Sequence, residues 1–265
     1  MGRSGSVAIG DTEMYYVRFG QGRRNLVVIP GLSDGLATVK GKALFLSAPY
    51  RKFSKDFTVY MFSRKNKMPE GYSIADMADD QVMAMNKLGI GRASILGVSQ
   101  GGMIAQMIAV RHPDVVDRLV LAVTAPYAND TAREAVTGWI GMAQRGDHKA
   151  LMIDTAEKMY SYAYLRRNRK FFPLLVRFTK PKTYERFMRN AEAILGFDAR
   201  NRLGEIKCPT LIIAGDDDNT VGNDAPQEFG SAIEDCSVYI YHGLGHGVHE
   251  ESRDFYDRVL EFIRR

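Results

Sequence analysis

The chain has 265 residues, a length that suits one domain with a sizeable core. Hydrophobic residues make up 45% of it and charged residues 25%, as in an ordinary globular protein, and no apolar run is long enough to cross a bilayer. The formal net charge of +5 is modest, so composition alone favours neither a membrane protein nor a dedicated nucleic-acid binder.

The first six residues are polar and lack the apolar stretch of a signal peptide. They fit the N-myristoylation pattern through Gly2 and Ser6, but a short flexible tail or a cloning remnant is the simpler interpretation. The two cysteines, Cys208 and Cys236, are expected to be free thiols in a reducing compartment. These features predict a cytoplasmic protein.

Strand-like and helix-like patterns alternate along the chain. Short apolar or aromatic runs predict strands at 13–19, 25–30, 57–62, 93–98 and 118–124. A helix capped by Ser73 is expected at 74–88, and an apolar helix at 101–111 ends before Pro113. Parallel strands need crossovers, so the alternation predicts an α/β fold with a mostly parallel central sheet and helices on both faces.

The alternation breaks between residues 125 and 205, where no strand pattern is evident and several helical segments carry Met, Tyr and Phe. Beyond this segment, strands are expected at 210–215 and 237–241, and helices at 224–233 and 250–263. We therefore expect a core made of residues 1–124 and 206–265, with 125–205 inserted as a helical cap, or lid.

The basic residues gather in the same insertion, which holds 15 Lys/Arg against 9 Asp/Glu. The run from Arg166 to Lys170 could bind nucleic acid or attract anionic substrates, but a solvated helix face explains such a cluster more simply. We expect no nucleic-acid partner and no stable membrane insertion. The sequence carries no signal for an oligomeric state.

The pentapeptide Gly97-Val98-Ser99-Gln100-Gly101 fits the pattern Gly-x-Ser-x-Gly. Alone it could be an ordinary glycine-rich connection, but here it joins a predicted strand to a predicted helix. A sharp strand-to-helix turn strains the serine backbone and needs small residues on either side. It also places the hydroxyl at a helix N-terminus, where developing negative charge is favoured. The setting predicts that Ser99 is a nucleophile.

A nucleophilic serine needs a base, and the base needs a third group to orient it. Three acids, Asp216 to Asp218, follow the strand at 210–215, and three histidines follow the next strand: His242, His246 and His249. The acids lack the later ligands of an EF-hand, and the glycines between the histidines oppose a helix that would align them on zinc. We expect neither a metal nor a cofactor.

Residues 26–265 resemble the α/β-hydrolase family. The stretch Gly215–Val221 is similar to its Gly-x-x-Asp-x-x-Val element, which implies that Asp218 is the triad acid. The stretch Gly243–His246 is similar to its Gly-x-Gly-His element, which implies that His246 is the general base. The remaining acids and histidines of these loops are then expected to be structural: Asp216, Asp217, His242 and His249.

An acyl-transfer site also needs two N–H donors for the oxyanion. The backbone N–H of Gln100, the residue after the nucleophile, is one. The resemblance implies that the other is the N–H of Leu32, in the loop after the strand at 25–30. The family usually has His-Gly-x there, whereas this chain has Pro30 in place of the histidine. Ser33 and Asp34 are expected to brace the loop through bonds within the turn.

The resemblance implies a carboxylic ester hydrolase in which Ser99 forms an acyl intermediate that water then hydrolyses. Lactone, amide or C–C bond hydrolysis and cofactor-free perhydrolysis remain open on the same triad, as does a non-enzymatic small-molecule receptor. Dehalogenation and epoxide hydrolysis are disfavoured, because those relatives carry Asp where this chain has Ser99. A few apolar residues of the insertion should line an apolar pocket, and most should be core: Trp139, Met142, Met152, Met159, Tyr160, Tyr162, Tyr164, Phe171, Phe172, Phe178, Phe187 and Phe197.

Overall fold

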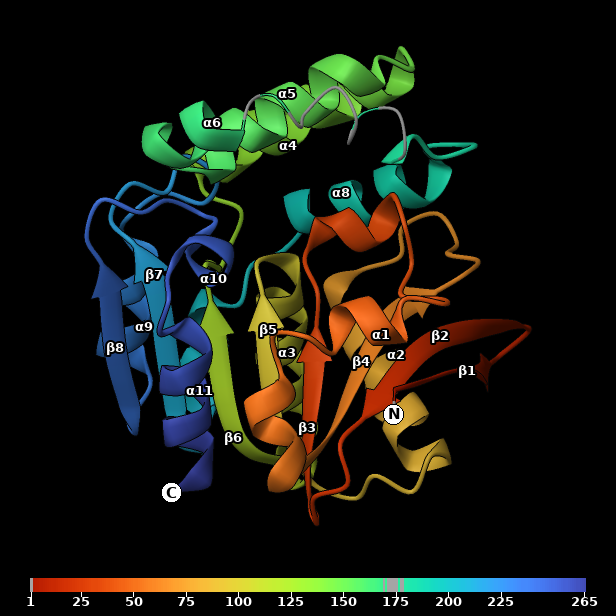
Figure 1. Ribbon diagram of the computed structural model, residues 1–265, viewed down its shortest axis with the longest axis vertical. Coiled ribbons are helices and arrows are strands. Elements are labelled where there is room, and N and C mark those ends of the chain that lie inside the picture. The colour runs from red at the N-terminus through yellow and green to blue at the C-terminus, as the bar shows by residue number, and fades with distance from the viewer. Residues whose placement is uncertain (1, 169, 171–175, 177–178) are drawn as a thin grey trace.

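An eight-stranded sheet forms the centre of the computed structural model, which describes residues 2–168, 170, 176 and 179–265 (Figure 1). The strand order is β1-β2-β4-β3-β5-β6-β7-β8. The strands are β1 (Arg3–Ile9), β2 (Thr12–Phe19), β3 (Arg24–Ile29), β4 (Phe57–Lys65), β5 (Ala93–Val98), β6 (Val116–Ala122), β7 (Thr210–Gly215) and β8 (Cys236–Tyr241). Neighbours from β4 to β8 pair in parallel, and β2 pairs antiparallel with β1 and β4. The predicted mostly parallel sheet is confirmed.

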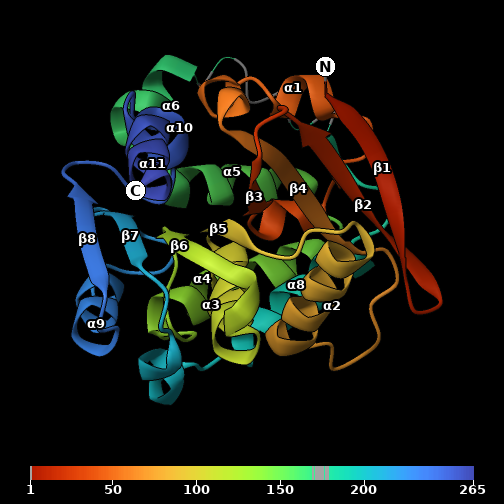
Figure 2. The same ribbon diagram turned by 90° about the horizontal axis from the view of Figure 1, so that it is seen from below.

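Helices cover both faces of the sheet, as predicted (Figure 2). One face carries α2 (Ile74–Lys87), α3 (Gln100–Arg111) and α9 (Ala225–Ala232). The other carries α1 (Ala43–Leu46), the 3-10 helix η2 (Arg51–Lys55) and α11 (Phe255–Arg264). In β5, Ile95 points into the first core and Leu96 into the second. Burial on both faces explains why the central strands read as unbroken apolar runs.

A group of helices lies between β6 and β7 in the sequence and over the carboxyl ends of the parallel strands (Figure 1). It consists of α4 (Asp130–Gln144), α5 (His148–Met159), α6 (Tyr162–Asn168) and α8 (Glu185–Leu195), followed by the 3-10 helix η5 (Arg200–Glu205). The side chains of Asn129 and Asp147 cap α4 and α5 by accepting from backbone N–H groups of the first turn. These helices therefore stand above the sheet edge at which α/β proteins gather their reactive groups.

Two expectations near the ends of the chain were wrong. Residues 3–6 are not a flexible tail, because β1 begins at Arg3 and pairs with β2 along its whole length. This edge strand buries only Val7 and Ile9, so its apolar signal is weak. The closing helix expected at 250–263 is two helices, α10 (Val248–Glu251) and α11, because the chain becomes extended at Ser252.

No helix in the described part of the chain is long and apolar enough to span a membrane. Cys208 and Cys236 are free thiols, both partly buried. Burial raises the pKa of each thiol. Both therefore resemble packed side chains more than activated nucleophiles.

Candidate active site

Ser99 occupies a strained turn between β5 and α3. Its φ of 54° and ψ of −121° lie in a region that non-glycine residues rarely adopt. Glycine is required on both sides: a Cβ on Gly97 would lie 2.4 Å from the carbonyl oxygen of Gly101, and one on Gly101 would lie 2.0 Å from that of Ile29. The Ser99 N–H is anchored to the Ala122 carbonyl of β6 at 2.9 Å. The turn therefore holds the hydroxyl at the N-terminus of α3.

Asp218 lies in the loop after β7, and its carboxylate is fixed by that loop. Oδ1 accepts the backbone N–H groups of Thr220, at 2.8 Å, and Val221, at 2.9 Å. Oδ2 lies 2.8 Å from Nδ1 of His246. The side chain is only 1% exposed, so water competes little for these bonds.

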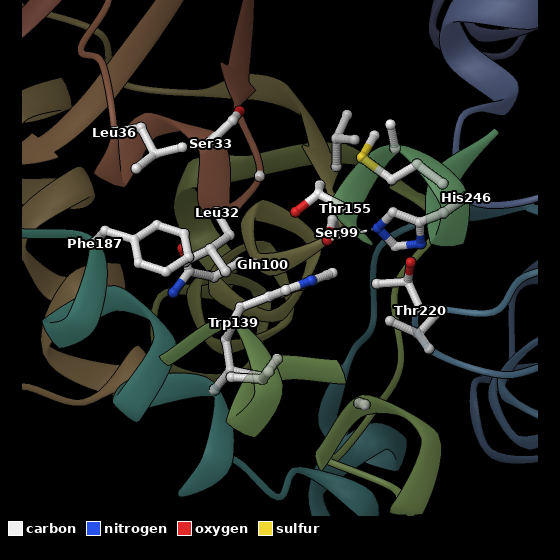
Figure 3. A pocket seen from close by; sticks show the side chains of 18 of the residues that line it. Leu32, Ser33, Leu36, Ser99, Gln100, Trp139, Thr155, Phe187, Thr220 and His246 are labelled. Carbon is white, nitrogen blue, oxygen red and sulfur yellow. Dashed lines mark hydrogen bonds between the residues drawn. The ribbon is translucent and has the colours of Figure 1, made fainter. Parts of the chain in front are cut away.

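His246 lies in the loop after β8 and faces Ser99 (Figure 3). A carboxylate only accepts, so Nδ1 carries the proton towards Asp218 and leaves the Nε2 lone pair free. Nε2 lies 2.8 Å from Ser99 Oγ, and the side chain of His246 is 4% exposed. The acid and base loops touch, since a Cβ on Gly245 would lie 2.7 Å from the Asp217 carbonyl oxygen. The structure thus brings together all three residues expected to form a triad.

The other acids and histidines of these loops make separate contacts. Asp216 accepts from Nδ1 of His242 and from a backbone N–H, each at 2.7 Å, and mainly the His242 bond lowers the pKa of Asp216. His249 has Nε2 3.6 Å from Glu250, and burial lowers its pKa. The three histidines face three different carboxylates and do not converge on one point, as zinc ligands would.

Two backbone amides are free beside Ser99. Leu32 begins the 3-10 helix η1 (Leu32–Gly35) and Gln100 begins α3, positions at which an N–H has no acceptor within its own helix. Neither N–H has a hydrogen-bond acceptor among the described residues. The loop lies against the nucleophile, because a Cβ on Gly31 would lie 3.3 Å from Cβ of Ser99. This arrangement can stabilise an oxyanion.

The loop that carries Leu32 is braced both by backbone bonds within the turn and by the side chain of Asp34. Asp34 Oδ2 accepts the backbone N–H of Arg64 at 3.0 Å and Nη2 of Arg186 at 2.6 Å. Burial raises the pKa of Asp34, but the Arg186 and Arg64 charges outweigh this and hold the pKa below its ordinary value. The expected bonds within the turn are present in the backbone: the Asp34 N–H donates to the Gly31 carbonyl at 3.2 Å, and the Leu36 N–H donates to the Ser33 carbonyl at 3.0 Å. The long-range contacts of the Asp34 side chain were not expected.

Four polar residues near the site were missed in the sequence: Arg64, Arg186 and Asn190, and the side chain of Gln100. Arg64 Nη2 donates to Gln100 Oε1 at 2.9 Å, and Gln100 Nε2 donates to the Asn190 carbonyl at 2.6 Å. β4 extends three residues beyond its expected end at residue 62, and the sequence offered no apolar signal there, because Ser63, Arg64 and Lys65 are all polar.

A cavity of about 270 Å³ opens in front of Ser99 (Figure 3). Five of the apolar residues predicted in the insertion line it: Trp139, Met152, Met159, Tyr160 and Phe187. Of the others, Phe197 is buried, Met142 packs against the core, and Tyr162 is exposed. Three more, Phe171, Phe172 and Phe178, lie outside the described residues, as does Arg169 of the basic run. A mostly apolar cavity with a few polar groups in its wall is typical of a small-molecule site.

A model of the α/β hydrolase fold matches residues 26–252, so the chain belongs to the α/β-hydrolase fold family. RutD of Serratia proteamaculans, a protein to which carbamate hydrolysis is attributed, is 25% identical over 86% of this chain and 88% of its own. MGS-M2, an α/β hydrolase enzyme from a Medee basin deep-sea metagenome library, has a structure that covers 98% of both chains with a TM-score of 0.89 and 22% identity. The enol-lactonase of Burkholderia xenovorans LB400 covers 98% of this chain and 100% of its own, with a TM-score of 0.85 and 23% identity.

Proposed function

We propose that this chain is a serine hydrolase that cleaves small carboxylic esters by acyl transfer. In this scheme Ser99 is the nucleophile, His246 the general base and Asp218 the acid that orients it. The observation that carries the proposal is the hydrogen-bond chain from Ser99 Oγ to His246 Nε2 and from His246 Nδ1 to Asp218 Oδ2, with both distances 2.8 Å.

The reaction follows from these contacts. As Ser99 Oγ attacks the carbonyl carbon, its proton passes to His246 Nε2, and the Asp218 carboxylate stabilises the resulting imidazolium. The carbonyl oxygen becomes an oxyanion facing the N–H groups of Leu32 and Gln100, and each such donor typically lowers the barrier by about 3–4 kcal/mol. His246 returns the proton to the leaving alkoxide. Water then attacks the acyl-Ser99 carbonyl by the same route, which releases the acid and restores the serine.

The shape of the site supports a small substrate with an apolar portion. The cavity of about 270 Å³ lies near the lower end of small-molecule pockets, which start at about 300 Å³. Because residues of α4, α5 and α8 form part of its wall, we assign 125–205 as a cap domain over a core of 1–124 and 206–265. The scheme requires no cofactor. The free thiols support a cytoplasmic location.

Carbamate and lactone hydrolysis are second candidates, since the similarity to RutD and to the enol-lactonase favours them. Both reactions begin with attack on a carbonyl carbon and pass through a tetrahedral oxyanion, so they would use the same residues. The fold itself does not choose among these substrates.

The test is a panel of p-nitrophenyl esters of increasing acyl length, run beside a phenyl carbamate and a small lactone. We expect turnover of the short esters by the wild-type chain and its loss in Ser99→Ala, with unchanged thermal unfolding. If only the lactone or the carbamate is turned over, and the turnover still depends on Ser99, then the nucleophile is correct and the substrate class is that compound's and not the ester. Turnover that survives in Ser99→Ala would contradict the proposal.

A further inference from the structure

A buried guanidinium lies next to the proposed oxyanion site. Arg64, near the end of β4, has a side chain with 0% exposure, and its Nη2 donates to Oε1 of Gln100 at 2.9 Å. Its Nε and Nη1 make no hydrogen bond to any described residue. Burying a charge with incomplete pairing is costly, and such groups tend to occur where function needs them. Nothing in the packing of an apolar core requires an arginine at this position.

The cluster around Arg64 carries an excess of positive charge. Its one carboxylate, Asp34, faces two guanidiniums, with Oδ2 3.8 Å from Arg64 Nη1 and 2.6 Å from Arg186 Nη2. A neighbouring acid, Asp80, is already bonded to Lys65, at 3.0 Å, and to the hydroxyl of Tyr72. Burial lowers the pKa of Arg64 to about 10, which still leaves it cationic at neutral pH. One carboxylate and two guanidiniums leave a net positive charge in this cluster, which contacts the side chain of Gln100.

Arg64 contacts both of the segments that supply oxyanion donors. Its backbone N–H holds Asp34 at 3.0 Å and with it η1, which begins at Leu32. Its side chain holds that of Gln100, whose backbone N–H is the second donor. Leu32 and Gln100 both line the cavity (Figure 3). Arg64 therefore contacts the segments of both donors, one through its backbone N–H and the other through its side chain.

Helix α8 completes this network from above. Arg186 Nη2 donates to the Arg64 carbonyl at 2.9 Å, and Gln100 Nε2 donates to the Asn190 carbonyl at 2.6 Å. Asn190 Nδ2 in turn donates to the Arg186 carbonyl at 2.7 Å, which ties the two α8 residues together. Both oxyanion segments are therefore fixed from two sides, by β4 and by α8.

We propose that Arg64 is a positioning residue of the oxyanion site, which fixes both donor segments and surrounds them with positive charge. The inference rests on the proposed serine hydrolase function. A positive charge in a buried, low-dielectric place stabilises the anionic tetrahedral state more than the neutral bound substrate. Arg64 therefore acts on kcat and on the binding of tetrahedral anions, and hardly on KM.

The test compares Arg64→Met and Arg64→Lys with the control Arg24→Met. Arg24 pairs with Asp117 at 3.2 Å at the opposite end of the sheet. For each protein, kcat and KM are measured on p-nitrophenyl butyrate, per active site titrated with a fluorophosphonate. The affinity for butaneboronic acid is also measured, because its boron bonds to the serine oxygen and forms a tetrahedral anion. Counting titrated sites removes any effect of misfolded protein.

We expect Arg64→Met to lower kcat and boronate affinity together by about 10–100-fold, with KM changed by less than about threefold. Arg64→Lys should lie between this variant and the wild type, because lysine keeps the charge but not the planar fork. Arg24→Met should behave as the wild type.

A second variant keeps the test decisive if Arg64→Met does not fold. Gln100→Met removes the acceptor of Arg64 Nη2 at similar volume and leaves the Asp34–Arg64 pair intact, so it should also lower kcat and boronate affinity in parallel. If the variants that fold keep the wild-type kcat per titrated site and the wild-type boronate affinity, the role of Arg64 is overturned. The proposed hydrolase function would still stand. A wild-type chain without Ser99-dependent turnover of any ester, carbamate or lactone would overturn the proposed function, and this inference with it.

Discussion

The two sides of Ser99 are held in place by different kinds of interaction. On the β7–β8 side, the carboxylate of Asp218 is fixed by backbone N–H groups only two and three positions later in the chain. On the β3–β4 side, Asp34 is held by Arg64 and Arg186, which lie 30 and 152 positions away. On the first side the acid is thus fixed by short-range loop geometry, whereas on the second side Asp34 depends on partners that the assembled fold brings to it. We expect the first to control proton transfer and the second to control charge stabilisation and stability.

The largest expected effect belongs to the β7–β8 side. Replacing His246 with Gln removes the proposed base, so we expect kcat on p-nitrophenyl butyrate to fall by about ten-thousand-fold. His242→Gln is the matched control, because that exposed ring bonds only to Asp216 in the neighbouring loop; its kcat should stay within about threefold. An equal loss of kcat in the two variants would contradict the assignment of His246, and not His242, as the general base.

The next effect belongs to the β3–β4 side and concerns stability. Asp34→Asn removes the carboxylate that faces two buried or partly buried guanidiniums, so we expect the free energy of unfolding to fall by about 3–5 kcal/mol at neutral pH. Urea unfolding measures the loss, and Asp216→Asn, an exposed carboxylate in a loop, serves as the control. A loss below about 1 kcal/mol would show that the Asp34 cluster does not hold this side together.

The wild type and Asp34→Asn should also differ in how their unfolding free energy changes with pH. The pKa of Asp34 is lowered in the folded chain, so the unfolded chain takes up its proton first. The stabilisation from Asp34 is therefore complete above the ordinary carboxyl pKa of about 3.9 and is lost as the pH falls through the lowered value. The gap between wild type and Asp34→Asn should narrow as unfolding is measured from neutral pH down to about pH 3. A constant gap would mean that Asp34 does not act through its charge.

The smallest effect is expected where the helical insertion meets the β7–β8 side. Ser161 donates to Glu251 of α10 at 2.5 Å through its hydroxyl and at 2.9 Å through its backbone N–H. Ser161→Ala keeps the backbone bond to Glu251. It removes the hydroxyl, which also accepts the backbone N–H of Tyr164 at 3.3 Å. Both lost bonds are partly exposed, so we expect a loss of about 1 kcal/mol in unfolding free energy and an unchanged kcat. A loss as large as that in Asp34→Asn would mean that the Ser161–Glu251 contact stabilises the fold as much as the Arg186–Asp34 contact does.

The sequence predicted what short-range chemistry decides. The sheet and its helices follow from the alternation of apolar runs, and Gly97 is needed because a Cβ there would collide with the Gly101 carbonyl oxygen within the same turn. The acid and base could be recognised because the stretches Gly215–Val221 and Gly243–His246 resemble elements of the α/β-hydrolase family. Arg64 could not, because its role depends on burial and on partners brought to it by η1, α3 and α8. The strand at Arg3–Ile9 was missed for a related reason: the pairing with β2, and not its own apolarity, makes it a strand.

The most direct test of the proposed nucleophile is covalent labelling with a fluorophosphonate, followed by intact mass and peptide mapping. The reagent forms a bond from phosphorus to the serine oxygen and releases fluoride, and the serine proton leaves through the base. We predict a single label, carried by the peptide that contains Ser99, with no label in Ser99→Ala and very slow labelling in His246→Gln. Labelling of another residue, or equal labelling of Ser99→Ala, would contradict the assignment of Ser99 as the nucleophile.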